Sequence, residues 1–240
     1  MTLLLVLPAV GIILFLGRGL SGAFKMAMLM LQIQFLIAFP FLTENAPGYL
    51  SRAFELSRQF LFKWTVNWRF VGEETFLGRP FSLTLLVMHV SVLAGFVLNK
   101  WFKPAGKQLS AIIGPILKFQ SPFNPLEERQ VAARVTPDFV MTTILSANAI
   151  GLLFARSLHY QFYSYLAWST PYLLWRSGAH PIVQYGLCAL QEWAWNVFPS
   201  TPASSAVVVA VLGTTVALIA ASKDERSEPI SKIQGETKVA

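Results

Sequence analysis

Seven apolar stretches of membrane-spanning or near-spanning length run along the sequence, and they limit its fold more than any other feature. A helix that crosses the hydrocarbon core of a bilayer needs about 20 mostly apolar residues. Because no alternation of apolar and polar residues recurs as it would in a transmembrane barrel, we expect an all-α, polytopic membrane protein with about seven transmembrane helices. The expected helices are residues 2–16, 26–42, 81–99, 139–155, 158–175, 181–198 and 203–221.

The composition agrees with a membrane protein and argues against a soluble domain or a nucleic-acid-binding protein. Charged residues make up 13% of the 240 residues, against about 25% in an ordinary soluble domain. The net charge is +7, but the cations are separated by apolar runs, which argues against a nucleic-acid partner. The single cysteine, Cys188, lies in an apolar run without zinc-binding spacing. We therefore predict no metal and no cofactor.

The distribution of Lys and Arg predicts an orientation. Cytosolic loops of membrane proteins are enriched in these residues, and most of the 19 cations fall on one side when the C-terminus is placed in the cytosol. The predicted bundle then covers residues 1–221, with a luminal loop at 43–80, a cytosolic loop at 100–137 and a disordered cytosolic tail at 222–240. Short surface helices are expected at 51–62 and 126–134.

The run FLFKWTVNWRF, residues 60–70, is the first candidate site. Aromatic residues are common where a membrane protein meets the interface, but such a belt does not require two cations and an amide beside the rings. Cations donate charge-assisted hydrogen bonds to phosphate, so the run suits a ligand with a phosphate and a lipid tail. The alternation resembles a strand, but an exposed strand edge is unfavourable here, and we expect a helix or an irregular loop. The candidates are Lys63, Trp64, Asn67, Trp68 and Arg69.

Two further polar clusters lie at the ends of predicted helices. The run ARSLHYQFY, residues 155–163, contains Arg156, His159, Tyr160 and Gln161; the run QEWAWNVFPST, residues 191–201, contains Glu192 and Asn196. A histidine at a helix end is more often a structural hydrogen-bonding group than a site residue, although imidazole also serves as an acid or base near neutral pH. An acid near the bilayer is normally paired, and Arg156 is a possible partner for Glu192.

All three clusters reach the luminal side in the predicted topology. We therefore expect one polar cavity that opens away from the cytosol, with aromatic walls and positive charge. A transporter or flippase for a lipid-linked or anionic solute fits such a cavity, although no pair of sequence repeats is evident. A scaffold without a ligand would not need three such clusters on one face.

The same stretches also carry a family resemblance. The runs SRAFELSRQFLFKWTVNWRF, ARSLHYQFYSYLAW, TPYLLWR and EWAWNVFPST closely resemble those of the dolichyl-phosphate-mannose-dependent α-1,3-mannosyltransferases of N-glycan assembly. The resemblance implies a multi-pass GT-C protein of the endoplasmic reticulum membrane. It implies mannose transfer from dolichyl phosphate mannose to the dolichyl-diphosphate-linked Man5GlcNAc2 oligosaccharide, without a metal and with inversion. It also implies that His159 and its neighbours line the donor site.

The resemblance also leads to an expectation about length. Members of this family are longer and have further transmembrane helices before the matched region, and GT-C enzymes usually place a catalytic acid in their first luminal loop. Both Asp residues of this chain, Asp138 and Asp224, fall on the predicted cytosolic side. We therefore expect the chain to correspond to the C-terminal portion of the enzyme, to lack the catalytic acidic loop and to be inactive alone. The catalytic residues are left unassigned.

Overall fold

The computed structural model describes residues 6–53 and 61–222, and its regular elements are all helical. The all-α prediction is confirmed, and no strand occurs within the described ranges. Short 3₁₀ turns lie at Phe62–Trp64, Arg69–Val71, Lys103–Ala105 and Tyr160–Phe162, and a π-helical turn lies at Val97–Trp101. The α-helices are α1 (Leu7–Ala53), α2 (Glu73–Leu77), α3 (Arg79–Phe96), α4 (Leu109–Leu117), α5 (Pro125–Ala133), α6 (Pro137–Leu153), α7 (Tyr163–Arg176), α8 (Pro181–Asn196) and α9 (Pro202–Ala221).

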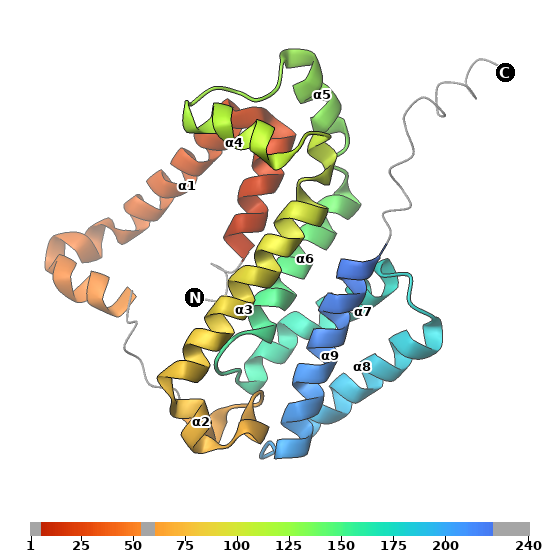
Figure 1. The fold of residues 1–240 in the computed structure, drawn as a ribbon. Coiled ribbons are helices and arrows are strands. Elements are labelled where there is room, and N and C mark those ends of the chain that lie inside the picture. The colour runs from red at the N-terminus through yellow and green to blue at the C-terminus, as the bar shows by residue number, and fades with distance from the viewer. Residues whose placement is uncertain (1–5, 54–60, 223–240) are drawn as a thin grey trace.

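Helix α1 contains both of the first two predicted spans and is bent between them. The bend occurs at Gly19, whose backbone has φ 66° and ψ 178°, a conformation that essentially only glycine adopts. The segment before Gly19 lies beside the other helices, whereas the segment after it leaves the bundle, as the red-to-orange ribbon in Figure 1 shows. The helix continues to Ala53 with a second irregularity at Asn45, so the first part of the predicted luminal loop 43–80 is helical, and its place on the luminal side stays a prediction.

Replacing Gly19 with alanine is expected to destabilise the fold by about 1–3 kcal/mol, because an L-residue is strained in this conformation. An added Cβ would also meet the Glu128 carboxylate at 2.9–3.1 Å. Gly11→Ala, in the same helix, is the matched control, since nothing lies within 4 Å of its added Cβ. Thermal unfolding in detergent should separate the two variants. Equal melting temperatures would contradict the role assigned to Gly19.

The core lies where α6, α7, α8 and α9 pack together, with α9 in contact with the other three. Ile150, Leu166 and Leu212 are among its fully buried side chains. Helix α9 begins at a capping box in which the Thr201 hydroxyl accepts from the Ser204 N–H and the Ser204 hydroxyl accepts from the Thr201 N–H. Such a box satisfies backbone groups that a helix start otherwise leaves unpaired, and it fixes where α9 meets the preceding loop.

Three helices within the described ranges are long and apolar enough to cross a membrane. They are Leu7–Ala53, Arg79–Ala105 and Pro202–Ala221, and the apolar helix Pro137–Leu153 is somewhat shorter. The chain is therefore an all-α membrane protein. The remaining helices α7 and α8, of 14 and 16 residues, are shorter than the roughly 20 residues that a span needs, so the number seven stays a prediction.

The predicted span 158–175 begins later than expected, because α7 starts only at Tyr163. The Leu158 N–H bonds to the Asn67 side chain at 2.7 Å, and the Leu158 carbonyl accepts from the Val66 N–H at 2.8 Å. These long-range bonds take the backbone groups that a helix would use internally. Residues 154–159 therefore form a non-helical connection instead of the start of a span.

The predicted cytosolic loop 100–137 contains two short helices. Helix α5 confirms the surface helix expected at 126–134, whereas α4 was not anticipated. Helix α5 begins with a capping box between Asn124 and Glu127, and Lys107 bonds to the Glu127 carboxylate at 2.9 Å. The other predicted surface helix, 51–62, lies mostly outside the described residues, as does the predicted tail beyond residue 222.

The Asn124 N–H and then Lys107 lower the pKa of Glu127 below its ordinary value of 4.5. A carboxyl whose folded-state pKa is lowered stabilises the fold above its ordinary pKa, and this contribution disappears as the pH falls through the folded-state pKa. The melting temperature should therefore fall on acidification below pH 4.5, and it should fall less steeply for Glu127→Gln. Glu74→Gln, in α2, serves as control. An identical acid dependence for wild type and Glu127→Gln would contradict this.

Candidate functional site

The three polar clusters meet at one end of the bundle, where α6 connects to α7 and α8 to α9. In Figure 1 this end is at the bottom, next to α2. Hydrogen bonds join the three segments: the Ser200 hydroxyl donates to the Thr65 carbonyl at 2.7 Å, and the Phe70 N–H donates to the Ser205 hydroxyl at 3.1 Å. The Val66–Leu158 backbone bond completes the connection. Segments separated by up to 135 residues thus form one local structure.

Asn67 and Trp68 hold this structure together through hydrogen bonds within the protein, and they do not line the cavity described below. The Asn67 side chain is fully buried; its amide donates to the Ala155 carbonyl at 2.7 Å and accepts from the Leu158 N–H and the Thr65 hydroxyl. Trp68, in the left-handed region with φ 55°, donates from its indole to the same Ala155 carbonyl at 3.1 Å. Their amide and indole N–H groups are therefore used within the protein. Residues 61–71 form an irregular loop with two 3₁₀ turns, which is one of the two alternatives expected for 60–70; residue 60 lies outside the described residues.

A cavity of about 340 Å³ opens where the segments meet. Its wall combines two cations, three aromatic rings, a proline and two hydroxyls. The residues that line it are Lys63, Trp64, Arg69, Tyr160, Phe198, Pro199 and Ser200. It therefore has the positive charge and the aromatic walls that the sequence predicted.

The two cations are held by the backbone and by rings. The Arg69 guanidinium donates to the carbonyls of Phe62 and Lys63 at 3.4 and 3.2 Å and lies 5.1 Å from the centre of the Phe62 ring. The Lys63 ammonium lies 5.3 Å from the centre of the Trp64 ring. Within the described part of the chain no carboxylate forms an ion pair with either cation. Both positive charges therefore remain available to an anion.

Tyr160 contributes a hydroxyl to the same wall. It donates to the Val197 carbonyl at 2.5 Å, and its ring packs edge-on against Phe198 at 5.5 Å. Burial raises the pKa of Tyr160 above its usual value of 10.0. The phenol therefore stays neutral at physiological pH, and it ties the segment before α9 to the segment before α7.

The other predicted site residues do not line the cavity. The His159 ring bonds through Nδ1 to the Trp64 carbonyl at 3.2 Å, so it positions a residue of the wall. Gln161 is exposed. The Glu192 carboxylate accepts from Asn196 at 2.8 Å and from the Tyr163 hydroxyl.

The possible contact between Arg156 and Glu192 is not formed. Arg156 donates instead to the carbonyls of Phe76 and Leu77 at 3.0 and 2.9 Å, and it lies over the Phe76 ring. Because α2 ends at Leu77, this arginine binds the carbonyl end of α2, where a cation is favourable.

Sequence reasoning missed three residues of the wall, Phe198, Pro199 and Ser200. They lie in the run 191–201, but an apolar ring, a proline and a serine before a helix carry no chemical signal of their own. The predicted absence of a metal site stays a prediction; within the described ranges no three His, Cys, Asp or Glu residues gather as metal ligands.

A comparison with protein families identifies the family of this chain. A family model described as "ALG3 protein" matches residues 1–205. The chain belongs to the ALG3 protein family. A Neurospora crassa relative is 62% identical over 231 residues, which is 95% of this chain and 52% of that protein. A human relative is 40% identical over 211 residues, 87% of this chain and 46% of that protein.

Both relatives are named Dol-P-Man:Man(5)GlcNAc(2)-PP-Dol alpha-1,3-mannosyltransferase. The resemblance drawn from the sequence motifs is thereby confirmed. The chain spans about half the length of these ALG3 relatives. No solved structure matches it, and the GT-C fold therefore stays a prediction.

Proposed function

We propose that this chain forms the donor-binding part of an ALG3-type mannosyltransferase. The reaction is transfer of mannose from dolichyl phosphate mannose to dolichyl-diphosphate-linked Man5GlcNAc2 in α-1,3 linkage, for protein N-glycosylation in the endoplasmic reticulum membrane. The relatives' names supply the donor, the acceptor and the linkage. The observation that carries the proposal is the cavity, which places two cations without carboxylate partners among aromatic walls.

The position of the cavity suits a lipid-linked substrate. Ser200 lies two residues before Pro202, where the apolar helix α9 begins. On the other side of the wall, Arg69 precedes by ten residues Arg79, where a second membrane-length helix begins. The cavity is therefore at the level of an interface, where a dolichyl chain can stay in the bilayer while its phosphate reaches the protein. The rings of Trp64 and Phe198 offer flat apolar faces to the sugar or to the first isoprene units.

The two cations have a chemical task in such a reaction. When the bond between the mannose C1 and the phosphate oxygen breaks, negative charge grows on the departing dolichyl phosphate. Lys63 and Arg69 stabilise this charge more than that of the bound donor, and such differential stabilisation lowers the barrier. The acceptor hydroxyl must also lose a proton to a base. The cavity wall contains no carboxylate, and the base is not assigned.

Deletion of the gene segment that encodes the residues of the donor cavity should cause dolichyl-diphosphate-linked Man5GlcNAc2 to accumulate. The product with six mannoses (Man6) should be lost. A flippase defect also leaves Man5 unextended in intact membranes, so the decisive assay uses detergent-solubilised membranes with added donor and acceptor. A transferase defect persists after solubilisation, whereas a transport defect disappears. Normal Man6 formation in the solubilised deletion membranes would contradict the proposal.

A further inference from the structure

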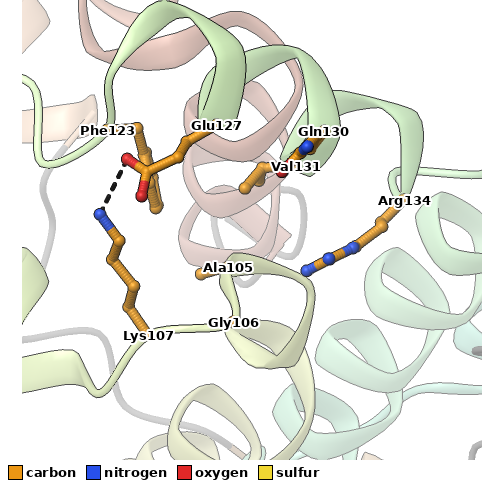
Figure 2. Close-up of a pocket in the computed structure, with 8 residues that line it drawn as sticks. All are labelled: Ala105, Gly106, Lys107, Phe123, Glu127, Gln130, Val131 and Arg134. Carbon is orange, nitrogen blue, oxygen red and sulfur yellow. Dashed lines mark hydrogen bonds and ion pairs between the residues drawn. The ribbon is translucent and has the colours of Figure 1, made fainter. Parts of the chain in front are cut away.

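A second polar cavity, of about 190 Å³, lies at the opposite end of the bundle, between the turn after α3 and helix α5. Figure 2 shows its wall, with the Arg134 side chain extending from α5 toward the backbone at Gly106. The residues that line it are Ala105, Gly106, Lys107, Phe123, Glu127, Gln130, Val131 and Arg134. None of them belongs to the donor cavity or to the motifs that indicated the family.

The cavity carries one net positive charge. Lys107 lies 2.9 Å from the Glu127 carboxylate and 5.1 Å from the centre of the Phe123 ring, so its charge is compensated. Arg134 makes one hydrogen bond, to the Pro104 carbonyl at 3.0 Å, and no ion pair within the described residues. Its remaining N–H groups and the Gln130 amide are donors at the cavity wall. This combination complements a group with a single negative charge, such as a phosphodiester.

The cavity also lies at the end of a helix of membrane-spanning length. The membrane-length helix that begins at Arg79 ends at Ala105, which is itself part of the wall. Gly106, with φ 66°, turns the chain there, and an added Cβ would lie 3.1 Å from the Arg134 guanidinium. Glycine thus lets the guanidinium approach the backbone at the end of a membrane-spanning segment.

A loop with apolar side chains borders the cavity. Lys107 donates to the Pro122 carbonyl at 2.9 Å, which closes a loop that contains α4. Leu117 and Phe119 on this loop are 76% and 91% exposed. Phe119 also has φ 55°, which is uncommon for a bulky residue. Exposed apolar groups beside a basic site are typical of segments that lie in a membrane interface.

We propose that this cavity binds the phosphodiester headgroup of an anionic phospholipid in the leaflet opposite the donor cavity. Arg134 and Gln130 bind the phosphate, and the α4 loop places Leu117 and Phe119 in the acyl region of the same leaflet. The proposal is independent of the mannosyltransferase reaction.

The test uses the purified 240-residue chain, delipidated in detergent and titrated with short-chain phosphatidylglycerol or phosphatidylcholine, with binding followed by native mass spectrometry. Phosphatidylglycerol should bind more tightly. Gln130→Glu should weaken its binding about tenfold or more, because it adds a negative charge to the wall. The Gln130 side chain is exposed and makes no hydrogen bond to any of the described residues, so the fold should tolerate the change. Arg134→Gln should weaken binding similarly.

Arg129→Gln is the matched control. It lowers the net charge by one, as Gln130→Glu does, at the neighbouring position of α5 and outside the cavity. It should bind phosphatidylglycerol as the wild type does. Equal weakening in Arg129→Gln and Gln130→Glu would overturn the site in favour of general surface charge. Equal binding of the two lipids, or full displacement of phosphatidylglycerol by millimolar inorganic phosphate, would overturn the assignment to a phospholipid.

Discussion

Arg69→Ala is expected to weaken binding of a short-chain polyprenyl phosphate mannose by about 10- to 100-fold. A hydrogen bond to a charged group contributes about 1.5–3 kcal/mol, and each 1.4 kcal/mol is about tenfold in affinity. The guanidinium lies at the wall of the donor cavity and has no carboxylate partner within the described residues. The measurement is a titration of the purified chain with the donor analogue.

Two further variants distinguish the effect of the positive charge at residue 69 from the effects of its hydrogen-bond geometry and of the overall net charge. Arg69→Lys keeps the positive charge but loses the bonds to the Phe62 and Lys63 carbonyls in their present geometry, so it should retain part of the affinity. Arg52→Ala, near the end of α1, removes an equal charge away from the cavity wall and should leave binding unchanged. Wild-type affinity in Arg69→Ala, with Lys63 intact, would contradict a phosphate contact at this site.

Asn67→Ala is expected to lower the free energy of unfolding by about 2–4 kcal/mol, because it leaves the buried Leu158 N–H without its acceptor and removes the bond to Ala155. The Asn67 side chain is fully buried and joins two segments that are about 90 residues apart in sequence. Because the same segments carry the cavity wall, donor binding should fall with stability. Unfolding in detergent against a denaturant provides the measurement.

Gln161→Ala is the comparison for this variant. Gln161 belongs to the same connection between α6 and α7, but its side chain is exposed and makes no hydrogen bond to the part of the chain that the structure describes. It should change the unfolding free energy by less than about 0.5 kcal/mol. If Asn67→Ala proved as stable as Gln161→Ala but bound the donor poorly, Asn67 would be a ligand contact, as the sequence first suggested.

The residue types in the three clusters predicted much of the site. Lys63, Trp64, Arg69 and Tyr160 were expected beside a lipid-linked phosphate, and they line one cavity. The predicted topology that brought the clusters to one side followed from the lengths of the apolar runs and the distribution of Lys and Arg. Charged side chains are rare near the end of an apolar helix unless they have a partner or a function, so their presence carries information, and a role in binding phosphate stays a prediction.

Other features could not be predicted, because they depend on contacts between distant segments. Asn67 between two cations resembles a ligand contact, and only the positions of Ala155 and Leu158 show that it is a buried structural amide. The same bonds delay the start of the expected fifth span to Tyr163. The bend at Gly19 depends on one backbone conformation, which neither hydropathy nor composition reveals.

Photo-crosslinking tests the central claim most directly. A polyprenyl phosphate mannose with a diazirine on its first isoprene unit would be added to the membrane-embedded chain, and the labelled residues would be identified by mass spectrometry. We expect labels in residues 62–71 and 197–200 and at Tyr160, and we expect excess unlabelled donor to remove them. Labels confined to α4 and α5, or labels that the unlabelled donor does not displace, would contradict the donor site.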